Sequence, residues 1–192
     1  MKYDLNNKTN KFAQRTLLAF SSSLMELLET KEFEKITVGE ICDVCNYPRA
    51  TFYNYFDDSF DLLNYCWIAM MQDIRVDDYP DMVPEERVYI LFDRIYDYFD
   101  LYRERLKKIM VNNSPSGALV MSCSLFVKQQ TSRIMLDCPY GNVHPVPHEL
   151  MAEHYSNTIQ LMIEWCFLRN KIKSKEEADR YLRYLLENTK GV

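Results

Sequence analysis

Apolar residues recur along most of this chain at spacings of three and four, the period of amphipathic α-helices. The first stripe predicts a helix of about five turns over residues 12–28. Later stripes predict helices over residues 59–75, 88–102, 106–110, 119–134, 150–170 and 175–188. No strand pattern is present, so we expect an all-α protein.

Two short helices are predicted between the stripe at residues 12–28 and the stripe at residues 59–75. The Thr37 hydroxyl can accept hydrogen bonds from the free N–H groups of a first turn, and Glu40 completes a capping box with it. We expect this helix to turn Ile41 and Val44 inward and to end at a turn formed by residues 45–47.

The next helix is expected over residues 48–55, with Pro48 in its first position, where a missing N–H costs nothing. It is too short to build a core of its own. Two short helices joined by a tight turn have the geometry that places the second one in a DNA major groove. Its exposed positions should be Arg49, Ala50, Thr51, Asn54 and Tyr55. Arg pairs with guanine and Asn with adenine through two hydrogen bonds each.

Composition supports a helical protein, and charge is distributed unevenly. Four glycines in 192 residues are few, and the net charge of −5 alone argues against a nucleic-acid partner. Residues 1–56, however, hold seven basic and seven acidic side chains, whereas residues 57–100 hold three basic and twelve acidic ones. An acidic body with a neutral N-terminal part indicates a protein that contacts DNA at one end.

A linker is predicted at residues 77–84, which contain two prolines and three aspartates. We expect a DNA-binding domain over residues 9–69 and a ligand-binding and dimerisation domain over residues 70–192. No signal peptide or membrane span is apparent, which predicts a cytoplasmic protein with reduced cysteines and no membrane partner.

The segment TVGEICDVCNYPRATFYNYF, residues 37–56, resembles the N-terminal domain of TetR-family transcriptional regulators. The resemblance covers residues 9–69. It implies a helix-turn-helix domain followed by a helical bundle, a homodimer on palindromic operator DNA, and repression relieved by a small apolar or aromatic inducer. We expect no cofactor, and no enzymatic activity either, because the chain has no Gly-rich phosphate loop, no nucleophile elbow and no paired carboxylates framed by glycine turns. No metal site is assigned.

The resemblance also implies roles for individual residues. Arg49, Ala50, Thr51, Asn54 and Tyr55 take the DNA-contacting positions of the family. Thr37 takes the phosphate-contacting helix start and Tyr53 the phosphate-binding tyrosine, while Lys8 and Lys11, with Arg15, form a basic N-terminal arm.

This chain departs from the family pattern at three positions. Asn46 replaces the turn glycine, and Pro48 replaces a hydroxyl cap. Ser59, which follows Asp57 and Asp58, replaces a lysine. The lost cation predicts DNA affinity that is weak or strongly salt-dependent, with the basic arm in compensation. A helical interaction or sensor protein with weak or lost DNA binding is therefore the alternative.

The C-terminal half offers a dimer interface and a ligand pocket. Residues 150–170 are apolar nearly all round, so partners must cover two sides of that helix. We expect it to pair with its copy, together with the last helix, through Leu161, Trp165, Leu182 and Leu185. Aromatic residues that would line a pocket, or simply form core, are Trp67, Tyr96, Phe99, Tyr102, Phe126 and Tyr155.

Two further groups of residues have metal-capable side chains. Cys42 and Cys45 form a C-x-x-C pair, which without a second ligand pair is typical of core residues. Cys138, His144, His148 and His154 match no known metal spacing, and whether they bind a metal is left open.

Overall fold

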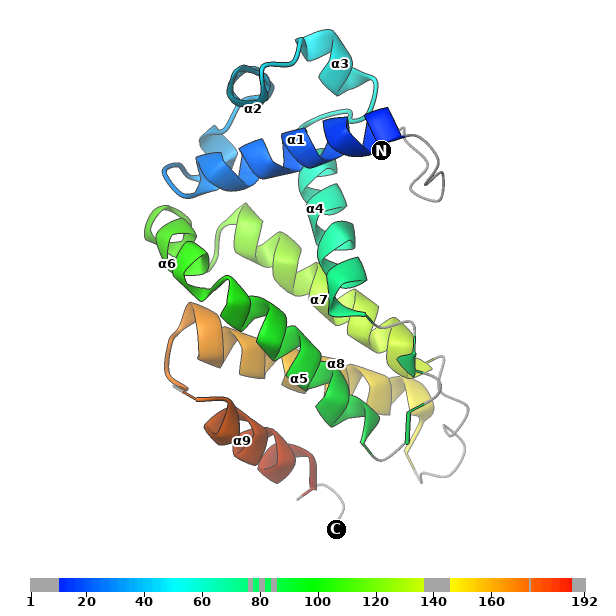
Figure 1. Ribbon diagram of the computed structural model, residues 1–192. Coiled ribbons are helices and arrows are strands. Elements are labelled where there is room, and N and C mark those ends of the chain that lie inside the picture. The colour runs from blue at the N-terminus through cyan, green and yellow to red at the C-terminus, as the bar shows by residue number, and fades with distance from the viewer. Residues whose placement is uncertain are drawn as a thin grey trace. The chain divides into compact units, whose positions relative to one another are not determined.

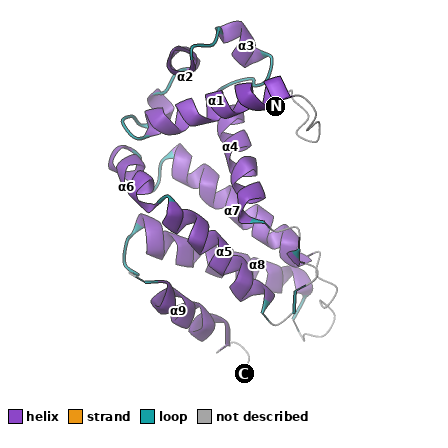
Figure 2. Ribbon diagram, in the orientation of Figure 1, coloured by secondary structure: helices purple, strands orange, loops and turns teal. Residues whose placement is uncertain are grey.

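A computed structural model describes residues 11–75, 78–79, 82–83, 86–136, 146–172 and 174–187 of the chain. Every regular element among these residues is helical, which confirms the all-α prediction (Figure 2). The elements are α1 (Lys11–Leu28), η1 (Phe33–Lys35), α2 (Val38–Cys45), α3 (Arg49–Tyr53), α4 (Ser59–Ile74), α5 (Arg87–Leu101), α6 (Arg103–Asn112), α7 (Ala118–Leu136), α8 (His148–Ile163), η3 (Glu164–Leu168) and α9 (Lys175–Glu187).

The contacts divide the chain into two compact units. The head unit comprises Met1–Met70 and Lys107–Val120, and the body unit comprises Met71–Leu106 and Met121–Val192. Helices α4, α6 and α7 each continue from one unit into the other. The expected domain boundary after residue 69 leaves residues 107–120 in the C-terminal domain, whereas the structure groups them with Met1–Met70.

The head unit has one hydrophobic core built on α1. Figure 1 shows α2 and α3 on one side of α1, which α4 approaches from the other. The fully buried side chains include Leu17, Phe20, Leu24 and Leu28 from α1, Ile41 from α2, Phe52 from α3, Phe56, and Leu62 and Leu63 from α4. Ile109 and Leu119, from the second segment of the unit, complete this core.

Asn113 lies buried at the end of α6 and joins the two segments of the head unit. Its Oδ1 accepts a hydrogen bond from the backbone N–H of Phe33 at 2.9 Å. Its Nδ2 donates to the carbonyls of Lys31 at 3.2 Å and Ile109 at 2.9 Å. Nearby, the backbone N–H of Ala118, the first residue of α7, donates to Glu34 at 2.7 Å.

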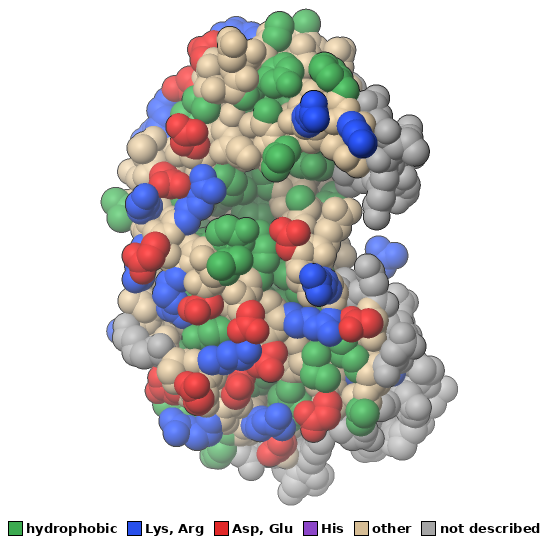
Figure 3. All heavy atoms as spheres, viewed as in Figure 1, with side chains coloured by type: hydrophobic (Ala, Val, Ile, Leu, Met, Phe, Trp, Pro, Cys, Tyr) green, Lys and Arg blue, Asp and Glu red, His purple; other side chains and the backbone are tan. Residues whose placement is uncertain are grey.

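In the body unit, α5, α8 and α9 pack together through buried apolar faces. Their contributions are Leu91, Phe92, Ile95 and Phe99 from α5, Ala152, Ile159 and Met162 from α8, and Ala178, Leu182 and Leu186 from α9. Acidic and basic side chains intermingle on the surface over α5 and α9 (Figure 3), where Lys175 pairs with Asp97 at 2.8 Å.

Three local predictions were wrong. Val44 is 41% exposed, and Cys42 takes the buried position instead, because residues 41, 42 and 45 share one face of a short helix. Tyr102, expected within the helix over residues 88–102, instead follows α5 and is 39% exposed. The helix expected over residues 150–170 leaves α geometry at Ile163, continues as a π-helical turn and ends before Asn170, whose φ of 48° is left-handed.

Among the described residues, no helix has both the length and the apolar character needed to cross a membrane.

Candidate nucleic-acid interface

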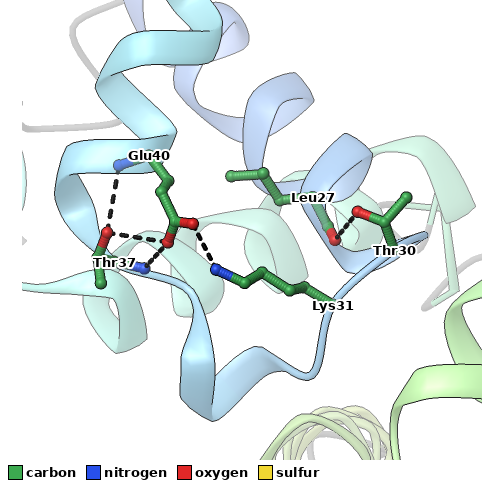
Figure 4. Close-up of polar contacts among 5 residues, drawn as sticks. All are labelled: Leu27, Thr30, Lys31, Thr37 and Glu40. Atoms are coloured by element: carbon green, nitrogen blue, oxygen red, sulfur yellow. Dashed lines mark hydrogen bonds and ion pairs between the residues drawn. The ribbon is translucent and has the colours of Figure 1, made fainter.

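The first turn of α2 is held by the predicted capping box (Figure 4). Thr37 Oγ1 accepts from the N–H of Glu40 at 3.3 Å, and Glu40 Oε2 accepts from the N–H of Thr37 at 3.0 Å. The other carboxylate oxygen of Glu40 pairs with Lys31. The Lys31 ammonium, followed by the Thr37 hydrogen bonds, lowers the pKa of Glu40 to about 2.

The turn between α2 and α3 depends on Asn46, which adopts φ 55° and ψ 43°. Asparagine tolerates this left-handed conformation better than most residues, so it can replace a glycine here. Pro48 lies one position outside α3 with ψ 145°, and α3 begins at Arg49 rather than at Pro48 as predicted. The Pro48 carbonyl still starts the helix, since it accepts from Thr51 N–H at 2.9 Å.

A single buried residue anchors α3. The Phe52 ring lies edge-on to that of Phe20, at 5.3 Å between centroids, and 5.4 Å from that of Phe56. This five-residue helix buries only Phe52, so its other side chains are exposed or half-buried. Arg49, Ala50, Tyr53 and Asn54 are exposed, and Thr51 and Tyr55 are half-buried.

Acidic side chains cap the start of α4. Asp58 accepts a hydrogen bond from the N–H of Asp61 at 2.9 Å, and Asp61 accepts from the N–H of Asp57 at 3.1 Å. Asp58 and Asp61, on either side of Ser59, therefore stabilise a helix N-terminus, where carboxylates are favourable.

The basic arm is described only from Lys11 onward. Lys11 begins α1 and is exposed, as is Arg15 one turn later. Lys8 lies outside the described residues.

Gly39 is not among the predicted site residues, yet it is buried in the first turn of α2 beside the Arg49 guanidinium. The signal was present, because a glycine inside a predicted helix costs stability and indicates that another group approaches closely.

The residues expected to line a pocket divide between the two units. Trp67 is half-buried against the head core, and Tyr96, Phe99 and Phe126 are buried in the body unit. Tyr155 is half-buried there. Phe167, which the sequence analysis did not include, lies 5.0 Å from Tyr96 and 5.5 Å from Phe99 between ring centroids. Arg103 lies over the Phe167 ring at 4.6 Å and donates to the Tyr96 hydroxyl at 3.1 Å.

The residues expected at a dimer interface are mostly on the surface of the chain. Leu161, Trp165 and Leu185 are 43%, 41% and 40% exposed. Leu182 is 1% exposed, because it faces the body core, so it is not available to a partner.

The cysteine and histidine residues are dispersed. Burial raises the pKa of Cys66, Cys123 and Cys166 to about 12. The Cys45 thiol donates to the Ile41 carbonyl at 3.1 Å. His148 Nε2 lies 3.2 Å from the Leu136 carbonyl, and the His154 ring lies 5.6 Å from that of Tyr155, tilted by 47°. Cys138 and His144 lie outside the described residues, and the others form no metal-ligating group.

Solved structures share this fold. A protein of Syntrophomonas wolfei assigned as a TetR-family transcriptional regulator is 18% identical, with a TM-score of 0.69 over 90% of this chain and 94% of its own. A protein of Pseudomonas aeruginosa PAO1 assigned as a transcriptional regulator is 10% identical, with a TM-score of 0.65 over 98% and 97%. A Clostridium perfringens protein assigned as a fatty acid metabolism regulator is 16% identical, with a TM-score of 0.57 over 88% and 97%.

No protein-family model matches the chain, and no curated protein does. At these identities the likeness shows the fold, which is that of TetR-family regulators.

Proposed function

We propose that this chain, which folds as TetR-family regulators do, is a DNA-binding transcriptional repressor that reads operator DNA with α3. The observation that carries the proposal is the construction of α3. One buried side chain, Phe52, holds it to the head core, and Arg49, Thr51 and Tyr53 present hydrogen-bonding groups beside the small Ala50 on the rest of its surface. A helix so exposed contributes little to the core, whereas its dimensions suit a major groove.

Charge supports the same placement. Lys11, Arg15 and Arg49 are exposed in the head unit, and so is Thr37 at the start of α2. Backbone N–H groups at a helix start and basic side chains are the usual phosphate contacts of DNA-binding proteins. In the body unit, acidic residues pair with basic ones at the surface, as in the Arg183–Glu86 pair at 3.7 Å.

We further propose that two copies associate through α8 and α9. A single head contacts few base pairs, whereas two heads related by a two-fold axis read a palindrome and bind far more tightly. The exposed Leu161 on α8, Trp165 on the η3 turn that continues it, and Leu185 on α9 supply the apolar surface that such an interface needs.

Relief by a ligand is the third part of the proposal. Helix α4 begins beside the head core and continues past Met70 into the body unit. An inducer bound among the aromatic residues of the body would favour a head spacing that operator DNA does not accept. Inducer and operator would then each lower the affinity for the other by the same factor, about 5- to 150-fold.

Selection of duplexes from a random pool, followed by anisotropy titrations at several salt concentrations, tests the proposal. We expect the selected duplexes to be palindromes. The slope of the logarithm of the binding constant against the logarithm of the salt concentration should become shallower by about one for each phosphate contact that a variant loses. Arg49→Ala should reduce binding, whereas Arg133→Ala, which removes the same charge from an exposed position on α7, should not. No saturable binding at low salt would contradict the proposal.

That negative outcome would support the alternative function, a helical interaction or sensor protein of the same fold. Its supporting observation is the start of α4, where the sequence has Asp57, Asp58 and Asp61 around Ser59 and no Lys or Arg between residues 57 and 63.

A further inference from the structure

Gly39 lies in the first turn of α2 and is buried. Since it has no side chain, a neighbouring group must cover its backbone. Within a helix, glycine is less stable than alanine because it loses more backbone freedom on folding. A buried glycine at such a position indicates that another group occupies the space that a side chain would need.

The group that uses this space is the Arg49 guanidinium. A Cβ built at position 39 would lie against Arg49 Nη2, 3.1 Å from Cζ and 3.3 Å from Nε. These atoms form the far end of a flexible side chain. A methyl group at position 39 would therefore displace the guanidinium while the backbones of α2 and α3 stay in place.

Packing, rather than charge, keeps Arg49 over Gly39. The start of a helix carries partial positive charge, which does not attract a cation. Within the described part of the chain, no acceptor is hydrogen-bonded to the Arg49 guanidinium. The end of the Arg49 side chain thus occupies the space beside Gly39, while its N–H groups remain available to a ligand.

We propose that Gly39 is a specificity-determining residue of the DNA site, because it orients Arg49 for contact with a base edge. This inference rests on the proposed function. A guanidinium already packed in one orientation loses less freedom when it binds, and bidentate pairing with guanine depends on that orientation. Gly39 acts through Arg49 and is a positioning residue.

A double-mutant cycle on the full chain tests the inference. Gly39→Ala should leave the melting temperature unchanged or raise it by up to about 4 °C. It should lower discrimination at the base pair that Arg49 reads by about 3- to 10-fold, out of the roughly 5- to 150-fold loss expected for Arg49→Ala. In the Arg49→Ala background, Gly39→Ala should change discrimination by less than about twofold. Ser22→Ala, on the exposed face of α1, is the control for helix propensity alone.

Two results would overturn the inference. Equal losses with and without Arg49 would mean that the added methyl group acts on DNA directly, and no loss would mean that Gly39 orients nothing. If the wild-type chain selects no duplex, the proposed function fails instead. The orientation of Arg49 is then still measurable by nitrogen relaxation of its Nε–H, which should be ordered in the wild type and mobile in Gly39→Ala. Mobility in both would also overturn the inference.

Discussion

At the scale of single residues, Asn113 links the two chain segments of the head unit by hydrogen bonds. Asn113 is 3% exposed, and its Oδ1 accepts the hydrogen bond of the buried Phe33 N–H. Its donors satisfy carbonyls on both segments of the unit. Because a buried polar group without a partner costs more than a typical hydrogen bond contributes, replacing this residue affects several groups together.

We predict that Asn113→Ala lowers the free energy of unfolding by about 2–4 kcal/mol, chiefly by leaving the Phe33 N–H unsatisfied. Urea denaturation measures this change. The adjacent Asn112→Ala is the control, since it removes one hydrogen bond, to the Glu29 carbonyl at 3.0 Å, and should cost about 1 kcal/mol or less. Equal costs for the two variants would contradict the role given to Asn113.

A second residue-scale prediction separates base contacts from phosphate contacts. Asn54→Ala should weaken binding to the selected operator by about 1–3 kcal/mol and relax base choice at one position. Tyr53→Phe and Lys11→Ala should weaken binding evenly across sequences. Competition titrations with single-base operator variants measure both effects. If Asn54→Ala preserves the full preference, α3 does not read bases through that residue.

At the scale of the element, the first turn of α2 contains a carboxylate, that of Glu40, whose pKa is far below its ordinary value. Glu40 titrates at about 2 in the folded chain, against an ordinary value of 4.5. A group whose pKa falls on folding stabilises the folded state above its unfolded pKa, and that contribution disappears as the pH falls through the folded value. The capping box should therefore weaken between pH 4.5 and pH 2.

We predict that the difference in stability between the wild type and Glu40→Gln is largest near pH 6 and shrinks toward zero near pH 2. Denaturation midpoints of both proteins across this range measure it. Lys31→Met should reduce the pH dependence, because the Lys31 ammonium is the largest cause of the low pKa. A difference that stays constant with pH would contradict the role of the Glu40 charge.

Elements whose signals are local could be predicted from the sequence. Thr37 and Glu40 lie three residues apart and form their capping box, and Asn46 supplies the left-handed turn. Signals from distant residues could not be read in this way. The Phe33 N–H is satisfied by a residue eighty positions later, and Val44 is exposed because neighbouring elements cover a different face of α2. The place of Arg49 over Gly39 likewise depends on how two helices meet.

At the scale of the whole molecule, the proposed dimer makes affinity depend on apolar side chains of the body unit. Trp165 and Leu161 are exposed and close together in sequence on α8 and η3, whereas Leu182 belongs to the core. Disrupting the interface should reduce operator binding without altering the head.

We predict that Trp165→Glu converts the dimer into a monomer at micromolar concentration, because a charge at an apolar interface is costly to desolvate. Sedimentation velocity measures the change, and operator affinity should fall with it. Leu101→Glu introduces the same charge at a residue that is 76% exposed on α5 and should leave the dimer intact. A wild-type monomer at this concentration would contradict the proposed assembly.

The two-segment composition of the head unit has a consequence for how the protein forms during synthesis. All the proposed DNA-contacting residues emerge from the ribosome before Met70, yet the core that supports them includes Ile109 and Leu119. The nascent head therefore lacks part of its core until Val120 has been added. Since domains fold as units during translation, a chain that stalls between these points would carry an incomplete head, and a truncated gene product ending near residue 70 would not compete for operators.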